Sequence, residues 1–219
     1  MIFANRAEAG RSLAWRLQKY ANRSDVVVLG IPRGGVPVAF EVAEGLHAPL
    51  DVFLLRKLGV PGHEELAFGA IASGRVRVLD RQTLLALSIS SQDIEAVTAR
   101  EQRELHRREL AYRGDRPALS VTGQTVILVD DGIATGASLL AGIRALQQLR
   151  PAKIVVAVPV APPAACERLA YEVDEFVCVA APEHFRAVGQ FYDDFSQVDD
   201  EEVIEMLSRN HHASARNAA

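Results

Sequence analysis

The sequence predicts an α/β fold in which a central parallel sheet is flanked by helices. Short β-branched runs alternate along the chain with stretches of helical periodicity, an order that parallel strands joined by crossover helices require. The chain has 219 residues, 49% of them hydrophobic, and a chain of this length buries about 70% of its unfolded surface. We therefore expect one domain over residues 1–207, with a helical insertion at about 80–118 and a flexible tail at 208–219.

The N-terminal half of the chain predicts the first strands of this sheet and two helices. Apolar residues recur at three- and four-residue spacing in residues 5–20, which predicts an amphipathic helix. The run VVVLGI at 26–31 is short, β-branched and followed by Pro32 and two glycines, which predicts a buried strand and a tight loop. The further expected elements are a helix at 36–46, a strand at 51–55, and a short strand at 67–72 within the glycine-rich segment 56–74.

The C-terminal half continues the alternation of strands and helices. Residues 93–108 are mostly charged, and we interpret them as a long solvated helix within the insertion. The further expected elements are a turn at 114–117, strands at 125–129, 153–159 and 175–179, and helices at 137–149, 164–171 and 199–207. A doubly wound sheet of this kind binds its ligands beyond the carboxyl ends of its strands.

Composition and charge exclude several classes of protein. Lys and Arg total 24 against 28 for Asp and Glu, a net charge of −4, whereas a protein whose main partner is nucleic acid needs a basic surface. Charges at Arg6, Glu8 and Arg11 interrupt the N-terminal apolar residues, and no run reaches the length of a membrane span. Cys166 and Cys178 lack zinc-site spacing, so we expect inert thiols. We expect a cytoplasmic protein without a membrane segment.

The segment VILVDDGIATGAS at 126–138 carries the strongest chemical signal in the sequence. An apolar strand ends in Asp130 and Asp131, and a loop of small residues at 134–138 then opens a helix. A helix start offers unpaired N–H groups and the positive end of the helix dipole, so this loop predicts a phosphate site. The two carboxylates cannot also bind a phosphate, and they suit the vicinal hydroxyls of a ribose or a divalent metal.

This motif resembles the phosphoribosyl-diphosphate (PRPP) binding motif of the type I phosphoribosyltransferases. The resemblance implies that Asp130 and Asp131 bind the ribose hydroxyls, with Asp131 also among the catalytic residues. It implies that the 5-phosphate is held by Ala134, Thr135, Gly136, Ala137 and Ser138. Gly132 departs from the family, which usually has an aliphatic residue at this position. The alternative without a ligand is a turn that caps a helix.

The segment IPRGG at 31–35 follows the first predicted strand and resembles the diphosphate loop of the same family. The positive charge of Arg33 and the backbone N–H groups of Gly34 and Gly35 would bind an anion there. A glycine turn with a surface arginine is the alternative interpretation.

The segment LLRKLGVPG at 54–62 resembles a strand end of the adenine phosphoribosyltransferases. The resemblance implies that Arg56 and Lys57 are catalytic and face the diphosphate, although adjacent basic residues are otherwise usually solvated. It also implies that residues 59–74 form a mobile loop that closes over the site and excludes water. The titratable residues of that loop are His63, Glu64 and Glu65.

The segment APEHFRAVGQFYDDF at 181–195 resembles the hood of hypoxanthine-type enzymes. By that resemblance Phe185 stacks on a purine, the Val188 carbonyl reads the edge of the purine, and Asp193 approaches a metal and the diphosphate. Those enzymes usually carry an aspartate in the phosphate loop as a proton acceptor, and here that position is Ala134. The resemblance therefore leaves the base open.

The combined resemblance implies a single-domain type I phosphoribosyltransferase fold with a C-terminal hood. The expected reaction, of the kind used in nucleotide salvage, is Mg²⁺-dependent transfer of 5-phosphoribose from PRPP to a nucleobase-like acceptor, with release of diphosphate. The alternative is a non-catalytic regulator that senses PRPP or a nucleotide in the same pocket. A homodimer is one open alternative for the assembly. The predicted charged helix carries Arg100, Arg103, Arg107 and Arg108. These arginines either add positive potential over the site or form only a solvated helix face.

Overall fold

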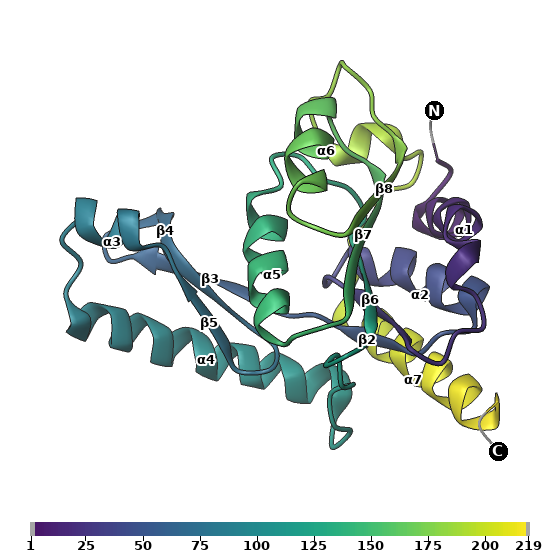
Figure 1. The fold of residues 1–219 in the computed structure, drawn as a ribbon, viewed down its shortest axis with the longest axis horizontal. Coiled ribbons are helices and arrows are strands. Elements are labelled where there is room, and N and C mark those ends of the chain that lie inside the picture. Colours follow the sequence, from purple (N-terminus) through teal and green to yellow (C-terminus); the bar gives the residue numbers. More distant parts are fainter. Residues whose placement is uncertain (1–2, 218–219) are drawn as a thin grey trace.

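The computed structural model describes residues 3–217, and its centre is a five-stranded parallel sheet (Figure 1). The strands are β1 (Val26–Gly30), β2 (Leu50–Val52), β6 (Thr125–Val129), β7 (Lys153–Val160) and β8 (Glu175–Ala180). Their order is β2-β1-β6-β7-β8, and every neighbouring pair is parallel. The predicted fold class is confirmed, and each predicted parallel strand is present within a few residues of its expected position.

Helices cover both faces of this sheet because alternate strand residues point to opposite sides. The helices are α1 (Arg6–Arg16), α2 (Gly35–Leu46), α5 (Ala137–Gln148), α6 (Pro163–Ala170) and α7 (Asp200–Asn217). Val26 and Val28 of β1 belong to a buried cluster with residues of α1, α2 and α7. Val27 and Leu29 belong to a second cluster, with residues of α5 and α6. The carboxyl edge of the sheet is thus held between two helical layers.

A second unit, which we call the arm, covers residues 55–113 and projects from the side of the parallel sheet (Figure 1). Its elements are β3 (Leu55–Val60), β4 (His63–Ala72), β5 (Val76–Leu79), α3 (Arg81–Ala86) and α4 (Ser91–Arg113). The strands form an antiparallel sheet in the order β3-β4-β5, and α3 and α4 correspond to the predicted helical insertion. The short strand predicted at 67–72 is confirmed as part of β4. The segment 59–74, predicted as a mobile loop, lies mostly in the antiparallel pairing of β3 with β4.

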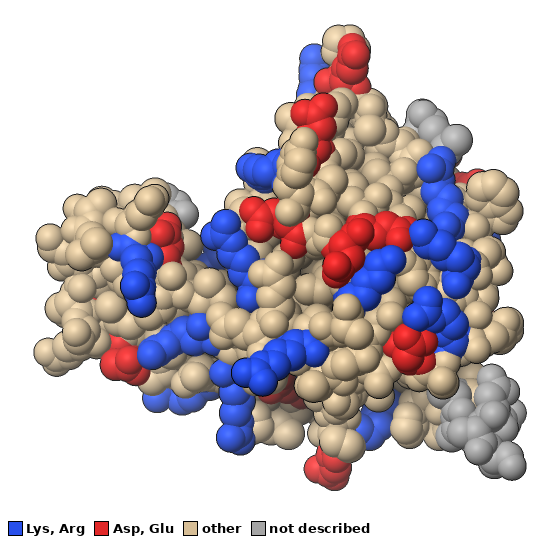
Figure 2. Space-filling view, viewed as in Figure 1, with Lys and Arg blue, Asp and Glu red and all other residues tan. Residues whose placement is uncertain are grey.

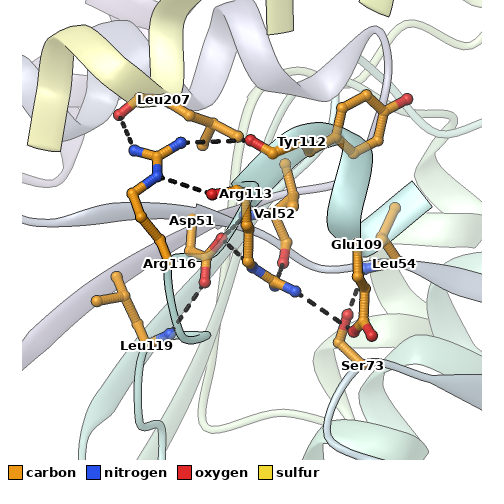
Figure 3. A network of polar contacts seen from close by, with 10 residues as sticks. All are labelled: Asp51, Val52, Leu54, Ser73, Glu109, Tyr112, Arg113, Arg116, Leu119 and Leu207. Atoms are coloured by element: carbon orange, nitrogen blue, oxygen red, sulfur yellow. Dashed lines mark hydrogen bonds and ion pairs between the residues drawn. The ribbon is translucent and has the colours of Figure 1, made fainter. Parts of the chain in front are cut away.

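A buried ion pair joins the arm to the parallel sheet (Figure 3). At the end of α4, Arg113 Nε donates to Asp51 Oδ1 of β2 at 2.8 Å, and Arg113 Nη2 donates to the Val52 carbonyl oxygen at 2.7 Å. Asp51 Oδ2 also accepts the N–H of Leu119 at 3.0 Å. Both charged side chains are only 8% exposed. Arg116 extends the network to α7, where its Nη1 donates to the Leu207 carbonyl oxygen at 3.4 Å.

The C-terminal helix corrects one prediction from the sequence. Residues 208–217 continue α7, although a flexible tail was predicted for 208–219, and residues 218–219 lie outside the described part of the chain. Asn210 is buried, its Oδ1 accepts the N–H of Leu50 at 2.8 Å, and its Nδ2 donates to the Ala48 carbonyl oxygen at 3.3 Å. A single buried amide anchors this end of the helix and leaves no periodic pattern in the sequence. Within residues 3–217, no helix combines the length and apolar character needed to cross a membrane.

Candidate functional site

The diphosphate loop and the acidic pair meet because their strands are neighbours. Gly30 at the end of β1 lies opposite Val129 at the end of β6, so both following loops leave the same edge of the sheet. A Cβ on Gly35 would lie 2.9 Å from Asp130 Cα, and a Cβ on Gly34 would collide with the Asp131 carboxylate. The two glycines therefore allow the close approach of the two loops.

This packing corrects part of the predicted anion site. The N–H of Gly35 donates to the Ile31 carbonyl oxygen at 3.0 Å, so it is used within the loop rather than offered to an anion. Gly35 is the first residue of α2 and is buried, which explains why its N–H turns inward. The positive charge of Arg33 remains available beside it.

The acidic pair lies at the end of β6 in a mostly buried setting. Burial raises the pKa of Asp130 well above its usual value, and the neighbouring Asp131 carboxylate raises it further. Burial also raises the pKa of Asp131, although Arg6 opposes that shift. The N–H of Asp131 donates to Asp130 Oδ1 at 2.9 Å, which orients the two carboxyl groups relative to each other. Such a pair suits hydrogen bonds with neutral hydroxyl groups.

Arg6 of α1 is a site residue that sequence reasoning missed. Its Nε donates to Asp131 Oδ2 at 2.9 Å, and its Nη1 donates to the Ser196 carbonyl oxygen at 2.8 Å. The guanidinium carbon lies 3.9 Å from the centre of the Phe195 ring. The hydroxyl of Tyr192 donates to the Asp131 carbonyl oxygen at 2.6 Å. Arg6 and Asp131 are 125 positions apart, so no local pattern connects them.

The predicted phosphate loop opens α5 as expected. Gly136 is the N-cap residue with a φ of 71°, and α5 starts at Ala137. Ala134 and Thr135 are exposed, and the side chain of Ser138 lies outside the described parts of the structure. Arg168 of α6 donates a hydrogen bond to the Thr135 carbonyl oxygen, which fixes one side of the loop. The N–H of Ala137 donates to Thr135 Oγ1 at 3.5 Å, and the following N–H groups of the first helical turn have no acceptor within the helix, so they suit an anion.

The hood segment explains the unusual glycine of the motif. A Cβ on Gly132 would lie 2.5 Å from Val188 Cγ1 and 3.0 Å from Val160 Cγ1. An aliphatic residue at position 132 would therefore exclude Val188 from its place beside the acidic loop. Phe185 packs on Phe191, with ring centres 5.1 Å apart, and stays partly exposed. Val188 is thus brought to the acidic loop, and Phe185 packs on Phe191 within the hood.

Comparison with known proteins identifies the family. The family model "Phosphoribosyl transferase domain" matches residues 1–196. The chain belongs to this family. Two Mycobacterium tuberculosis proteins, from strains CDC 1551 / Oshkosh and ATCC 25618 / H37Rv, are named "Putative phosphoribosyl transferase" and are each 45% identical over 218 residues. The chain spans about half the length of these relatives, 49%.

A solved structure supports the same fold for this phosphoribosyl transferase domain. The crystal structure of TT1426 from Thermus thermophilus is 44% identical to this chain, with a TM-score of 0.85. The match covers 95% of this chain and 99% of that chain. The fold match therefore includes the arm and the hood as well as the parallel sheet.

Arg56 and Lys57, which were predicted to face the diphosphate, lie outside the hollows beside Arg33 in this phosphoribosyl transferase domain. Arg56 Nη2 forms an ion pair with Glu101 Oε2 of α4 at 2.6 Å, and Lys57 is exposed on β3. Neither residue lines the hollows beside Arg33. Glu101 is largely buried, so it needs a cation, and the arm supplies Arg56 from its own first strand. In this structure Arg56 is thus bound within the arm, and its contact with a diphosphate stays a prediction.

The predicted metal residue also gains no support from the structure. Asp193 is exposed, and its N–H donates to the Phe3 carbonyl oxygen at 2.8 Å. In the described part of the chain, no three His, Cys, Asp or Glu side chains come together as candidate metal ligands.

The thiol of Cys178 is consistent with the predicted inert role, because burial raises its pKa to about 12.

A hollow of about 350 Å³ lies beside the acidic pair and combines predicted and unexpected residues. Arg33, Gly34 and Asp131 line it together with Arg6 and Phe195. A larger hollow of about 640 Å³ lies between α4 and the strands β4 and β5, and none of the predicted site residues lines it. The smaller hollow is therefore the candidate active site.

Proposed function

We propose that this chain transfers 5-phosphoribose from PRPP to a nitrogen of a nucleobase-like acceptor and releases diphosphate. The carrying observation is the position of Asp130 and Asp131, between the Arg33 loop and the helix start at Gly136. The Arg33 loop and the acidic pair follow the neighbouring strand ends of β1 and β6, and the helix start at Gly136 follows the acidic pair in the chain. We assign the diphosphate, the ribose and the 5-phosphate of PRPP to these three features in that order. Membership in the phosphoribosyl transferase domain family supports the same reaction class.

The acidic pair would hold and orient the ribose. The ribose hydroxyls would donate to the carboxyl groups of Asp130 and Asp131, while the first turn of α5 binds the 5-phosphate. Arg6 would act as a positioning residue, because its contact with Asp131 Oδ2 fixes the direction of that carboxylate. Fixing both ends of the sugar aligns its anomeric carbon for attack, which contributes to catalysis through positioning.

The acceptor would lie under the hood. Phe185 offers an aromatic ring for stacking, and Val188 lies beside the acidic loop. The phosphate loop carries Ala134 at the position where hypoxanthine-type enzymes usually have an aspartate. The Ala134 side chain cannot accept a proton from the acceptor. The acceptor is therefore a planar heterocycle, and these residues do not select one base over another.

The donor set of the site fits a magnesium ion that the substrate brings with it. Mg²⁺ binds through one or two carboxylates together with phosphate oxygens and water, rather than in an all-protein cage. Asp130 has no ion-pair partner among the residues that the structure describes, whereas Asp131 is already paired with Arg6. Asp130 would therefore be the carboxyl group that holds such an ion, and it would release its proton when the cation binds. When bound, the ion supplies positive charge to the leaving diphosphate.

The deciding experiment measures diphosphate release from Mg-PRPP in the presence of a panel of purine and pyrimidine bases. We expect release that depends on one class of base. Phe185→Ala should raise the apparent KM for that base by about ten-fold, because stacking is worth about 1–3 kcal/mol per base, and should leave PRPP binding unchanged. Tyr171→Ala is the matched control, since Tyr171 is an aromatic residue that is 92% exposed at the end of α6. PRPP binding without release for any base would favour the sensor function instead.

A further inference from the structure

A second hollow continues the candidate site toward the arm. It has a volume of about 230 Å³ and is lined by Pro32, Arg33, Arg107, Arg108 and Asp200. We call it the arginine pocket. Because Arg33 also lines the hollow at Asp131, the two hollows share one wall. Figure 2 shows Lys and Arg side chains gathered along the arm in the region of α4.

The fold brings α4 back to the parallel sheet at this point. The Tyr112 hydroxyl of α4 donates to Asp200 Oδ1 at the start of α7, at 2.6 Å. One residue further along α4, Arg113 forms the buried ion pair with Asp51. These two contacts fix the last turns of α4 beside the Pro32–Arg33 loop. Arg107 and Arg108 therefore belong to the arm but face the candidate site.

The charges in and around the arginine pocket leave an excess of positive charge. Glu104 is the partner of both helix arginines, at 2.8 Å from Arg107 Nε and 2.9 Å from Arg108 Nε. These hydrogen bonds lower the pKa of Glu104 to about 2, so it stays ionised. Among the residues that the structure describes, the ion-pair partner of Arg33 is Asp200, at 4.0 Å. Three guanidinium groups thus face two carboxylates, and each guanidinium has five N–H donors, so donors remain for a further anion.

We propose that Arg107 and Arg108 of α4, together with Arg33, form the subsite for the diphosphate group of PRPP and for the diphosphate product. This inference rests on the proposed function, because diphosphate is the leaving group of that reaction. Planar guanidinium groups bind phosphate oxygens in pairs, which suits a group with several anionic oxygens. Asp200 then holds Arg33 when no diphosphate is bound and is displaced by it. The arm supplies these cations from α4, since Arg56 of β3 is bound to Glu101.

The first test is titration calorimetry with inorganic diphosphate as the probe. Arg107→Gln combined with Arg108→Gln should weaken diphosphate binding by ten-fold or more. The affinity for ribose 5-phosphate should change less than two-fold, because that probe binds at the start of α5. Arg103→Gln is the matched control on the exposed face of the same helix, and it should leave both affinities unchanged. Wild-type diphosphate affinity in the double variant would overturn the subsite.

A second variant tests the same subsite with the opposite sign. Asp200→Asn keeps an oxygen that can accept the Tyr112 hydroxyl but removes the negative charge beside Arg33. We expect it to bind diphosphate about three-fold more tightly or better, since less competition remains for Arg33. This variant retains all three arginines, so it tests the subsite even if the double variant unfolds. Unchanged or weaker diphosphate binding by Asp200→Asn contradicts the role given to Asp200.

The same titrations separate this inference from the proposed function. A double variant that still binds diphosphate, in a protein that releases diphosphate in a base-dependent way, refutes the subsite alone. A wild-type protein that binds diphosphate through these arginines but binds neither PRPP nor ribose 5-phosphate refutes the transfer reaction alone. Inorganic phosphate is the third probe, and binding as tight as that of diphosphate would refute the assignment to a diphosphate group.

Discussion

Asp130 links ligand binding to stability at the scale of a single residue. Burial and Asp131 raise its pKa, so the native state keeps a proton that the unfolded chain loses above about pH 4. The contribution of this group to the free energy of unfolding therefore falls as the pH rises from about 4 toward the raised pKa of Asp130. Asp130→Asn keeps the oxygen that accepts the Asp131 N–H, and we expect it to be more stable than wild type at pH 7. Thermal unfolding of Asp130→Asn and wild type at pH 4 to 8 measures the difference in stability between them, and this difference should shrink toward pH 4.

The same substitution should impair ligand binding. Mg-PRPP would bind the ionised form of Asp130, and a lost hydrogen bond to a charged group costs about 1.5–3 kcal/mol, so Mg-PRPP affinity should fall by roughly ten-fold or more. For the stability prediction, Asp194→Asn is a control in which the pH dependence has the opposite sign, because hydrogen bonds with Ser196 lower the pKa of that exposed carboxyl group. Equal pH dependence of Asp130→Asn and wild type would show that the Asp130 carboxyl group is not held in the neutral form.

Arg6 is the second residue whose removal should be informative. Arg6 and Asp131 form an ion pair with side chains only 11% and 15% exposed. Breaking a buried pair leaves an uncompensated charge, so Arg6→Ala should lower the free energy of unfolding by about 3–5 kcal/mol, measured by urea denaturation. In an Asp131→Asn background the loss should be smaller, because no buried charge is left unpaired.

Arg11→Ala provides the matched control for Arg6→Ala. Arg11 lies on the same helix, but it is 60% exposed and its contact with Glu41 is 3.5 Å long. Exposed pairs of this kind contribute about 0–1 kcal/mol, so the control should change stability little. Similar losses for the two variants would mean that Arg6 has no special role in the site.

At the scale of the element, the start of α5 combines a strained backbone position with a ligand site. Gly136 and Gly123 both take left-handed backbone angles, with φ of 71° and 72°. A valine at either position adds backbone strain of about 1–2 kcal/mol, so both variants should lose stability. Only Gly136→Val also places a Cβ near the phosphate loop, where Leu169 Cδ1 lies at 3.1 Å and Ile133 Cγ2 at 3.2 Å.

We therefore expect Gly136→Val to lose ribose 5-phosphate binding and Gly123→Val to retain it. The measurement is the rise in unfolding temperature that ribose 5-phosphate produces in each variant relative to its own ligand-free value. Equal protection of both variants would place the phosphate site elsewhere in the fold.

At the scale of the whole molecule, the joint between the arm and the parallel sheet depends on Arg113. Arg113→Met should leave Asp51 buried without its cation and lower the free energy of unfolding by about 3–5 kcal/mol. Arg209→Met is the control, since Arg209 is 63% exposed and pairs with Glu205 only at 3.9 Å. Denaturant unfolding of both variants measures the difference. A loss of less than about 1 kcal/mol in Arg113→Met would show that packing alone holds the arm.

The sequence by itself determined the parts of this protein that depend on neighbouring residues. The apolar runs of β1 and β6 predicted buried parallel strands, because burial on both faces needs continuous hydrophobic residues. The acidic pair and the helix start at Gly136 were also readable, since their chemistry lies within one segment. Glycines, in contrast, were ambiguous: the segment 59–74 was predicted as a mobile loop with a short strand at 67–72, and the structure confirms the strand but extends it into a hairpin.

Only the tertiary structure decided which charged side chains meet. Arg6 reaches Asp131, Arg56 is bound by Glu101, and the arginines of α4 face Arg33 because of how α1, the arm and α7 pack on the sheet. The physical reason is that hydrophobic periodicity and turn chemistry act between near neighbours in the chain, whereas a long charged side chain takes its partner from whatever element packs beside it. Contacts between residues far apart in sequence leave no local pattern, so the sequence pointed to Arg33 and to the arginines of α4, whereas their partners and the role of Arg6 came only from the folded chain.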